Sequence, residues 1–243
     1  MSGHSHWAGI KHKKQAEDQK RGKIFSKLSR MISVAAREGA DPEMNPKLRQ
    51  ALEEAKAFNM PKENIERAIK RGTGELEGAK LEEVSYEAFG PGGVAIIIEG
   101  ITDNKNRTFQ EVKQILQKYS GKLAESGAVK WLFVRKGVIT INPNIQNSMS
   151  KEDLELKAIE AGAEDIYWHK TEDLLDIYTK PEELDKVKKN LEAQGIKIES
   201  VSLDWVPKDP IEVNDKDREE LTKLFEELDE NDAVQNIYST LEI

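Results

Sequence analysis

The feature that most constrains the fold is the apolar run VAIIIEGI at residues 94–101. β-branched residues favour extended structure, and a run that is apolar at nearly every position indicates a strand buried on both faces. The segment GPGG at 90–93 precedes the run and predicts a hairpin turn from an alternating strand at 84–89. The middle of the chain is therefore expected to be built around a sheet.

The residues before this sheet carry a helical pattern. Apolar side chains recur at 3.6-residue spacing over 16–38, a second helix starts at the cap Asn45, and a third ends at Gly72. Short connections between short helices are typical of a small bundle. We expect a basic arm at 1–15 and a helical bundle at 16–78.

The second half of the chain alternates strands and helices in the order β-α-β-β-α-β, which is the split βαβ pattern of a ferredoxin-like domain. Its limits are predicted at 136–206, after a strand at 128–134 and a turn at 135–137. The flanking segments 79–135 and 207–243 together supply a second set of strands and helices. The predicted fold class is therefore α+β with three domains: an N-terminal helical bundle and two ferredoxin-like α/β sandwiches, one inserted in the other.

Composition excludes several classes of protein. None of the 243 residues is cysteine, which rules out disulfides, thiolate nucleophiles and zinc–thiolate sites. No apolar run approaches the roughly 20 residues of a membrane-spanning helix, and the first residues lack the apolar core of a signal peptide. We expect a cytoplasmic protein without a membrane partner.

The charge of the chain is unevenly distributed. The net charge is −8, yet residues 1–37 hold nine basic and two acidic side chains, and residues 208–243 hold four basic and twelve acidic ones. Such an asymmetry favours a basic arm that binds a polyanion and an acidic body that keeps the protein soluble. A solvated charged surface without any ligand explains the charge alone equally well.

A basic stripe on the first helix supports the hypothesis that the chain binds a polyanion. Lys20, Lys23, Lys27 and Arg30 fall within an arc of about 80° on a helical projection, beside the apolar face. A basic stripe is the electrostatic footprint expected of nucleic-acid binding, although the cations near the end of the third helix also suit its dipole. The predicted nucleic-acid-binding residues are Lys11, Lys13, Lys14, Lys20, Arg21, Lys23, Lys27, Arg30, Arg67, Lys70 and Arg71.

Two further places are candidates for contact with nucleic acid. In the arm, His6 and Trp7 offer rings on which bases can stack. The loop at 102–108 is rich in polar groups, and Asn104, Asn106 and Arg107 form a possible second contact surface. The simpler explanation of this loop is an Asp or Asn side chain that caps the following helix.

Nothing in the sequence predicts a catalytic or metal site. Three of the four histidines lie in the arm, which offers no packed shell to fix their geometry, and no hydrolase, kinase or phosphate-loop motif occurs. We expect no catalytic residues, no metal, no cofactor and no small-molecule substrate. An enzyme with a site between the domains is the alternative, supported only by scattered acidic residues.

The chain resembles the YebC family over about its first 140 residues. The matching stretches are GHSHWAGIKHKK (3–14), KRGKIFSKLSR (20–30), VAAREG (34–39), NPKLRQAL (45–52), NMPKENIERAIKRGTGE (59–75), YEAFGPGGVAIIIE (86–99), TDNKNRT (102–108) and the SGAVKWLF–RKGVI region (126–139). His6 stands where the family more often has lysine. The resemblance implies three domains, one helical and two α/β, and a non-enzymatic cytoplasmic protein.

The resemblance also implies two roles, which this sequence does not separate. Members of the family are generally described as probable transcriptional regulators that bind DNA. Others, including the mitochondrial translational activator of cytochrome c oxidase subunit I, act on translation at the ribosome. The expected function is therefore a DNA-binding transcriptional regulator. The alternative is a ribosome-associated factor that binds ribosomal RNA and relieves stalling on proline-rich sequences.

Overall fold

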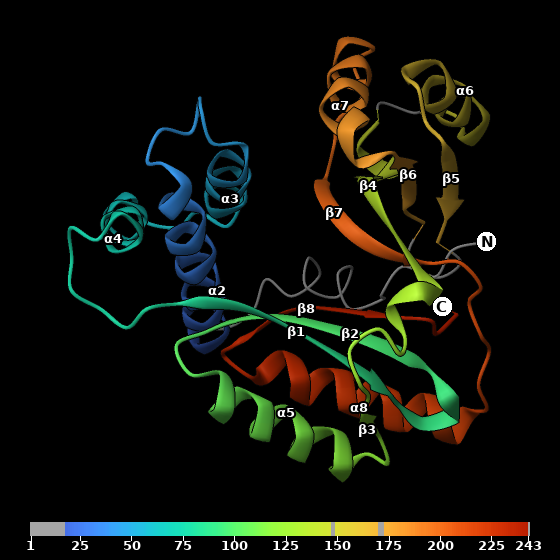
Figure 1. Cartoon of the computed structure of the whole chain (residues 1–243). Coiled ribbons are helices and arrows are strands. Elements are labelled where there is room, and N and C mark those ends of the chain that lie inside the picture. The colour runs from blue at the N-terminus through green and yellow to red at the C-terminus, as the bar shows by residue number, and fades with distance from the viewer. Residues whose placement is uncertain (1–17, 147–148, 170–172, 243) are drawn as a thin grey trace.

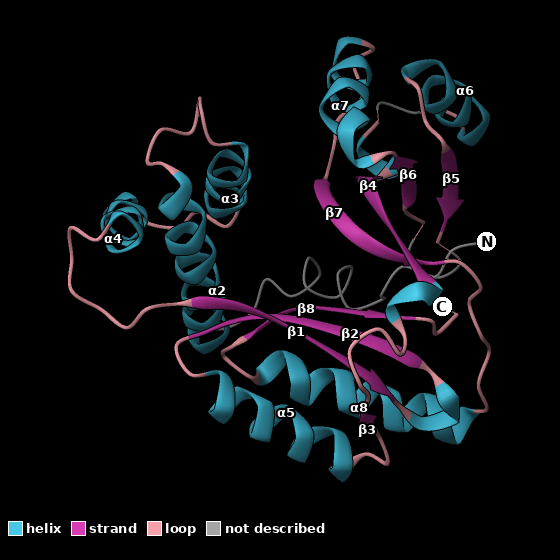
Figure 2. Ribbon diagram, in the orientation of Figure 1, coloured by secondary structure: helices cyan, strands magenta, loops and turns pink. Residues whose placement is uncertain are grey.

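The computed structural model describes residues 18–146, 149–169 and 173–242, in which a group of helices precedes two four-stranded antiparallel sheets (Figure 1, Figure 2). Each of these three groups has an apolar core of its own. The α+β class predicted from the sequence is confirmed. The helical group lies beside one end of the first sheet, and the second sheet lies above the other end (Figure 1).

The helical group begins with the longest helix in the described chain. Its elements are α2 (Asp18–Ala35), η1 (Ala36–Glu38), α3 (Pro46–Ala57) and α4 (Lys62–Thr73). As predicted, Asn45 caps α3, because its side-chain oxygen accepts a hydrogen bond from the backbone N–H of Leu48. The amide of the same side chain donates to the carbonyls of Ala35 and Gly39, at 2.7 and 2.8 Å, and so fixes the end of α2 against the start of α3.

Helices α2 and α4 approach each other closely at a glycine. A Cβ atom added to Gly72 would lie 2.3 Å from the carbonyl oxygen of Ser33 and 2.7 Å from the Cβ of Ala36. The hydroxyl of Ser33 donates to the carbonyl of Ala68 at 2.8 Å across the same contact. The two backbones therefore meet where only a glycine fits.

The first sheet, sheet A, is built around the apolar run seen in the sequence. Its strands are β1 (Glu82–Phe89), β2 (Ala95–Thr102), β3 (Lys122–Leu123) and β8 (Val234–Ser239), in the order β3-β1-β2-β8. The run occupies β2, between β1 and β8, as its composition predicts. Because β1 and β2 form a hairpin, no α-helix separates the first two strands of sheet A. The connectivity of this sheet therefore differs from the split βαβ order expected for a ferredoxin-like unit.

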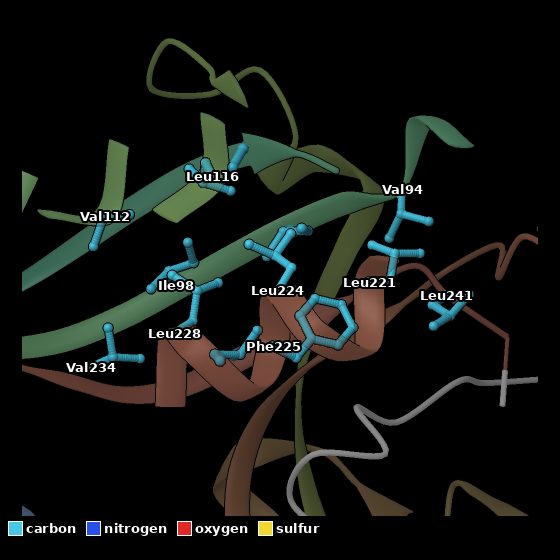
Figure 3. Close-up of a cluster of buried hydrophobic side chains, with 13 residues drawn as sticks. Val94, Ile98, Val112, Leu116, Leu221, Leu224, Phe225, Leu228, Val234 and Leu241 are labelled. Carbon is cyan, nitrogen blue, oxygen red and sulfur yellow. The ribbon is translucent and has the colours of Figure 1, made fainter. Parts of the chain in front are cut away.

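Two helices cover one face of sheet A. They are α5 (Lys105–Lys118) and α8 (Asp215–Glu230), and Figure 3 shows their apolar side chains packed against those of the strands. On the opposite face, Ala95, Ile97 and Tyr238 pack against Val129 and Phe133. Strand β2 is thus buried on both sides, which explains why it is apolar at successive positions.

The second sheet, sheet B, has the predicted order of elements. These are β4 (Phe133–Ile141), α6 (Lys151–Ala161), β5 (Asp165–Trp168), β6 (Leu175–Thr179), α7 (Leu184–Ala193) and β7 (Ser200–Pro207), with short 3-10 turns η4 (Pro143–Ile145) and η5 (Pro181–Glu183). The sheet order is β5-β6-β4-β7, so the first and third strands of the unit are its central pair. Both helices pack on the same core.

Two predictions near the junction of the sheets are wrong. Residues 130–132 form a 3-10 turn, η3 (Lys130–Leu132), instead of a strand, and the expected turn at 135–137 lies inside β4. Gly137 is not a turn residue: a Cβ added there would lie 2.3 Å from the Thr179 hydroxyl, so the glycine permits close packing between strands. The third strand of sheet A is instead the two-residue β3.

Candidate nucleic-acid interface

The cations predicted as a stripe on α2 connect this helix to sheet A. The amine of Lys27 lies 2.8 Å from a carboxylate oxygen of Asp229 and 2.7 Å from its backbone carbonyl. Lys23 forms an ion pair with Glu230, one residue further along. Arg30 donates to the carbonyl of Ile101 at 2.9 Å. These contacts join the helical group to β2 and to the end of α8.

The carboxylates in these contacts stand at an unfavourable place on α8. Asp229 and Glu230 occupy its last turn, where the helix dipole is negative and acidic side chains are destabilising. The amines of Lys23 and Lys27 supply the opposite charge. The basic stripe therefore compensates the acidic end of a helix about 200 residues further along the chain.

The position of Lys27 corrects one of the predicted contacts. The residue is 6% exposed, and its amine is engaged by two oxygens of Asp229. A phosphate cannot reach this amine without displacing α8. Lys27 is therefore a structural residue in this arrangement, and its position beside the apolar face of α2 explains its burial.

A small basic groove lies next to this junction. It has a volume of about 300 Å³ and is lined by Ser26, Ser29, Arg30, Arg71, Ala79, Leu81 and Asp103. Two arginines predicted from separate helices, Arg30 and Arg71, therefore share one surface with two hydroxyls from α2. Guanidinium and hydroxyl groups are the donors that proteins use most often for phosphate oxygens.

The acidic residue of the basic groove is neutralised by neighbours. Partial burial raises the pKa of the Asp103 carboxyl, but the hydrogen bond from Arg107, assisted by the charges of Arg107 and Arg30, holds that pKa below its ordinary value. Arg107 also lies 3.6 Å from Glu111. The Asp103 carboxylate thus stays ionised and paired, and Arg107 is engaged beside the groove.

The loop at 102–108 performs the simpler task foreseen for it. The Asn104 side chain accepts from the backbone N–H of Arg107 at 3.0 Å and so caps α5. Asn106 is exposed on the first turn of that helix. A contact of these residues with nucleic acid stays a prediction.

The remaining predicted residues divide into three sets. Arg21, Arg67, Lys70 and Arg71 are exposed, and Lys70 and Arg71 lie in the last turn of α4. Lys20 belongs to α2, but the structure describes only its backbone. Outside the described residues lie His6, Trp7, Lys11, Lys13 and Lys14.

A much larger cleft separates the helical group from the two sheets. Its volume is about 1960 Å³, and its lining includes twelve acidic and six basic side chains. Glu53, Glu99 and Asp204 line it from three different parts of the fold. An acidic cleft repels a phosphate backbone, so the basic exterior and not this cleft is the candidate surface for a polyanion.

One histidine outside the arm lines this cleft. His169 Nε2 lies 2.6 Å from a carboxylate oxygen of Asp176, whose other oxygen accepts from the hydroxyl of Thr140 at 2.7 Å. Both side chains are largely buried, at 10% and 4% exposure. The pair joins β6 to the residue that follows β5 and explains how a histidine is accommodated in sheet B.

The structure also reveals a feature that the sequence reading missed. Trp131 is 66% exposed, although a tryptophan in a predicted strand is expected to be buried. The loop that carries it is held by Glu87, whose carboxylate accepts from the backbone N–H groups of Gly127, Val129 and Lys130 at 2.6–2.9 Å. Gly127 has a φ of +87°, which places a turn directly before the segment predicted as a strand.

Within residues 18–146, 149–169 and 173–242, no group of three or more histidine or acidic side chains is placed to hold a metal ion. Over the same ranges, no helix is long and apolar enough to cross a membrane.

Two family models match the chain. The TACO1/YebC protein N-terminal domain matches residues 5–75, and the TACO1/YebC second and third domain matches residues 81–241. A relative from Halothermothrix orenii is 53% identical over all of this chain and 96% of its own length, and one from Thermotoga maritima is 52% identical over all of this chain and 94% of its own. Both are named probable transcriptional regulatory protein.

A solved structure has the same fold. The crystal structure of a conserved hypothetical protein from Aquifex aeolicus superimposes with a TM-score of 0.88 at 48% sequence identity. The match covers 98% of this chain and 97% of that one.

Proposed function

Since the chain belongs to the TACO1/YebC family, we propose that it is a non-enzymatic regulator of gene expression that binds nucleic acid through the basic groove. The observation that carries the proposal is the meeting of Arg30 and Arg71 with two serine hydroxyls in that groove. Arg67 and Lys70 are exposed on α4, the helix that carries Arg71, and extend its positive charge, whereas Arg21 lines the large acidic cleft. The arm at 1–15 adds further cations in sequence.

The distribution of charge supports this choice of surface. The cleft between the helical group and the sheets is lined by twelve acidic and six basic side chains. The groove is lined by two arginines and one acidic residue, Asp103, which is already paired with Arg107. A polyanion is therefore drawn to one side of the helical group and repelled from the other. Phosphate contacts of this kind give affinity and orientation without reading sequence.

The first target to test is DNA, because the curated relatives are named probable transcriptional regulatory proteins. Binding of labelled DNA duplexes and RNA fragments is measured by fluorescence anisotropy between about 50 and 200 mM salt. Arg71→Gln should weaken binding several-fold and reduce the slope of log affinity against log salt by about 0.7–0.9.

Arg49→Gln is the matched control. Arg49 is also an arginine of the helical group, but it lines the acidic cleft and lies 3.8 Å from Asp185. Its removal should leave the affinity unchanged. Equal effects of Arg49→Gln and Arg71→Gln would show that the basic groove is not the binding surface. The absence of any salt-dependent binding would contradict nucleic-acid binding itself. A preference for RNA, with ribosome co-sedimentation that survives DNase, would move the function to translation.

A further inference from the structure

The exposed Trp131 lies on a face of the molecule distinct from the basic groove. It belongs to η3, at the junction of sheets A and B, whereas the groove is formed by α2, α4 and the loop at 103. Exposing a large apolar ring costs free energy, at about 25 cal/mol per Å² of apolar surface left in water. Single exposed apolar side chains are common on protein surfaces, so what marks this ring as an interaction site is its fixed orientation together with the cations near it.

The ring of Trp131 is held in a fixed orientation. Its indole N–H donates to the carbonyl of Ala128 at 3.0 Å, so the single polar group of the side chain is already used. Its backbone carbonyl accepts from the amine of Lys208 at 2.8 Å, and the neighbouring carbonyl of Leu132 accepts from the backbone N–H of Lys208 at 2.9 Å. What Trp131 offers to a partner is therefore the flat apolar surface of the ring and not a hydrogen bond.

The loop beneath the ring is also rigidly built. The buried carboxylate of Glu87 receives three backbone N–H groups from it, and Val129 and Phe133 anchor it in the core on that face of sheet A. A preorganised aromatic ring loses little conformational entropy when a partner binds. The site thus has the rigidity of a stacking platform.

The chain segment around this platform is basic within an acidic body. Residues 122–137 hold four basic side chains and one acidic side chain, whereas residues 38–243 as a whole hold 28 basic and 43 acidic ones. Of the four, Arg135 and Lys136 form ion pairs with Glu99 and Glu164, so Lys122 and Lys130 are the relevant cations. Lys130 lies over the ring of Trp205, at 4.7 Å from its centroid, and Lys122 lies 6.0 Å from that of Phe89. The amines are thereby held on the same loop region as the exposed ring. An aromatic platform with cations beside it matches a base with its flanking phosphates.

We propose that Trp131 stacks on an unpaired base of a single-stranded nucleic acid, with the flanking lysines Lys130 and Lys208 near its phosphates. This inference rests on the proposed nucleic-acid-binding function and assigns it a second contact. A paired base in a duplex is already stacked on both sides and cannot cover the ring. The platform therefore selects single strands, loops or bulges, whereas the basic groove accepts any phosphate backbone.

The test compares variants of the full chain on short labelled single strands and on a duplex of the same sequence. Trp131→Ala should weaken single-strand binding by about 5- to 150-fold, which is the range found when one stacking aromatic is removed. Duplex binding should change less than about twofold. Trp131→Phe keeps an aromatic ring and should retain most of the single-strand affinity.

Ile159→Ala is the control for loss of exposed apolar surface, since Ile159 is 62% exposed on α6. It should leave both affinities unchanged. Tryptophan emission provides a second readout: single strands should quench the wild type more than Trp131→Phe, because Trp131 is the ring that becomes covered.

The outcomes separate the inference from the proposed function. Salt-dependent binding that Arg71→Gln weakens and Trp131→Ala leaves unchanged would overturn the platform and keep the groove, and the exposed ring would then be assigned to a protein contact. Equal losses by Trp131→Ala on single strands and on duplex would also overturn it, because stacking on an unpaired base predicts a difference. A wild type that binds neither probe would remove both proposals.

Discussion

Lys27 and Asp229 are 202 positions apart in the chain, yet the amine of one lies 2.8 Å from the carboxylate of the other. The lysine is nearly buried, and the aspartate side chain is 32% exposed. With the Lys23–Glu230 pair and the Arg30–Ile101 hydrogen bond, this contact attaches the helical group to sheet A. The basic stripe on α2, which the sequence predicts to be a ligand site, thus serves in part to attach α2 to sheet A.

Replacing Lys27 with Met tests the contribution of the Lys27–Asp229 contact to stability. The variant keeps the apolar stem but leaves the carboxylate and carbonyl of Asp229 without their charged donor, and we expect a loss of about 1.5–3 kcal/mol in the free energy of unfolding. The control is Lys47→Met, whose exposed pair with Glu38 should contribute no more than about 0.5 kcal/mol. Urea unfolding measures both, and equal losses would contradict the structural role of Lys27.

Substitution by alanine should have opposite effects on stability at two glycines in helices, Gly72 and Gly22. Gly72→Ala places a Cβ 2.3 Å from the Ser33 carbonyl and should destabilise the protein by about 1–3 kcal/mol as α2 and α4 separate. Gly22→Ala meets nothing within 4 Å and should stabilise α2 by about 0.5–1 kcal/mol. Thermal unfolding distinguishes them. If both variants melt above the wild type, the close approach at Gly72 is not a constraint.

Glu99 should control how firmly the two sheets are joined. Its carboxylate accepts from the indole N–H of Trp205 at 2.8 Å, and Arg135 lies 3.5 Å from the same oxygen. Glu99→Ala leaves the indole N–H unpaired and should cost about 1–3 kcal/mol, whereas Glu99→Gln keeps an acceptor and should cost less. Near-ultraviolet circular dichroism and urea unfolding report the change. Equal destabilisation by the two variants would show that charge, and not the indole hydrogen bond, matters there.

The Glu87 carboxylate should make stability depend on acidity. Burial raises its pKa, but the backbone N–H groups of Gly127, Val129 and Lys130 together hold the pKa below its ordinary value of 4.5. A group whose folded pKa is lowered stabilises the protein above its unfolded pKa, and this contribution is lost as the pH falls through the folded value. Between about pH 5 and pH 3, the free energy of unfolding of the wild type should therefore fall. That of Glu87→Gln, which lacks the carboxylate, should be lower at neutral pH and should change less over this range.

Urea unfolding at each pH provides the measurement. Glu125→Gln, at an exposed position on the same loop, should keep the wild-type pH profile. A profile for Glu87→Gln as steep as that of the wild type would assign the acid sensitivity to other carboxylates.

Much of the secondary structure could be predicted because its signals are local. Asn45 caps α3 as its sequence context indicates, and helix α6, at 151–161, is the first helix of the predicted β-α-β-β-α-β order. The apolar run in β2 correctly indicates a strand covered on both faces. The junction at 128–137 was predicted wrongly, since Gly137 serves contacts with Thr179 and Leu184 that no local pattern contains.

The candidate site could be predicted only in part. Charge and helical spacing correctly place Arg30 and Arg71 on helices, but only the fold brings them into one groove. The burial of Lys27 depends on Asp229, and helix spacing carries no information about so distant a partner. Trp131 was missed for a related reason: its exposure follows from the bonds that Glu87 makes to its loop, and those bonds join residues about 40 apart.

The position of β8 has a consequence for biosynthesis. Strand β2 acquires its partner β8 only after the whole of sheet B has been translated, since Ala95 and the Thr240 hydroxyl that it binds are 145 residues apart. At about 5–20 residues per second, the nascent β2 waits roughly 7–30 s with an unpaired apolar edge. An edge of that kind is prone to pair with other nascent chains, so chaperones that shield emerging strands should matter more for this protein than its native stability suggests.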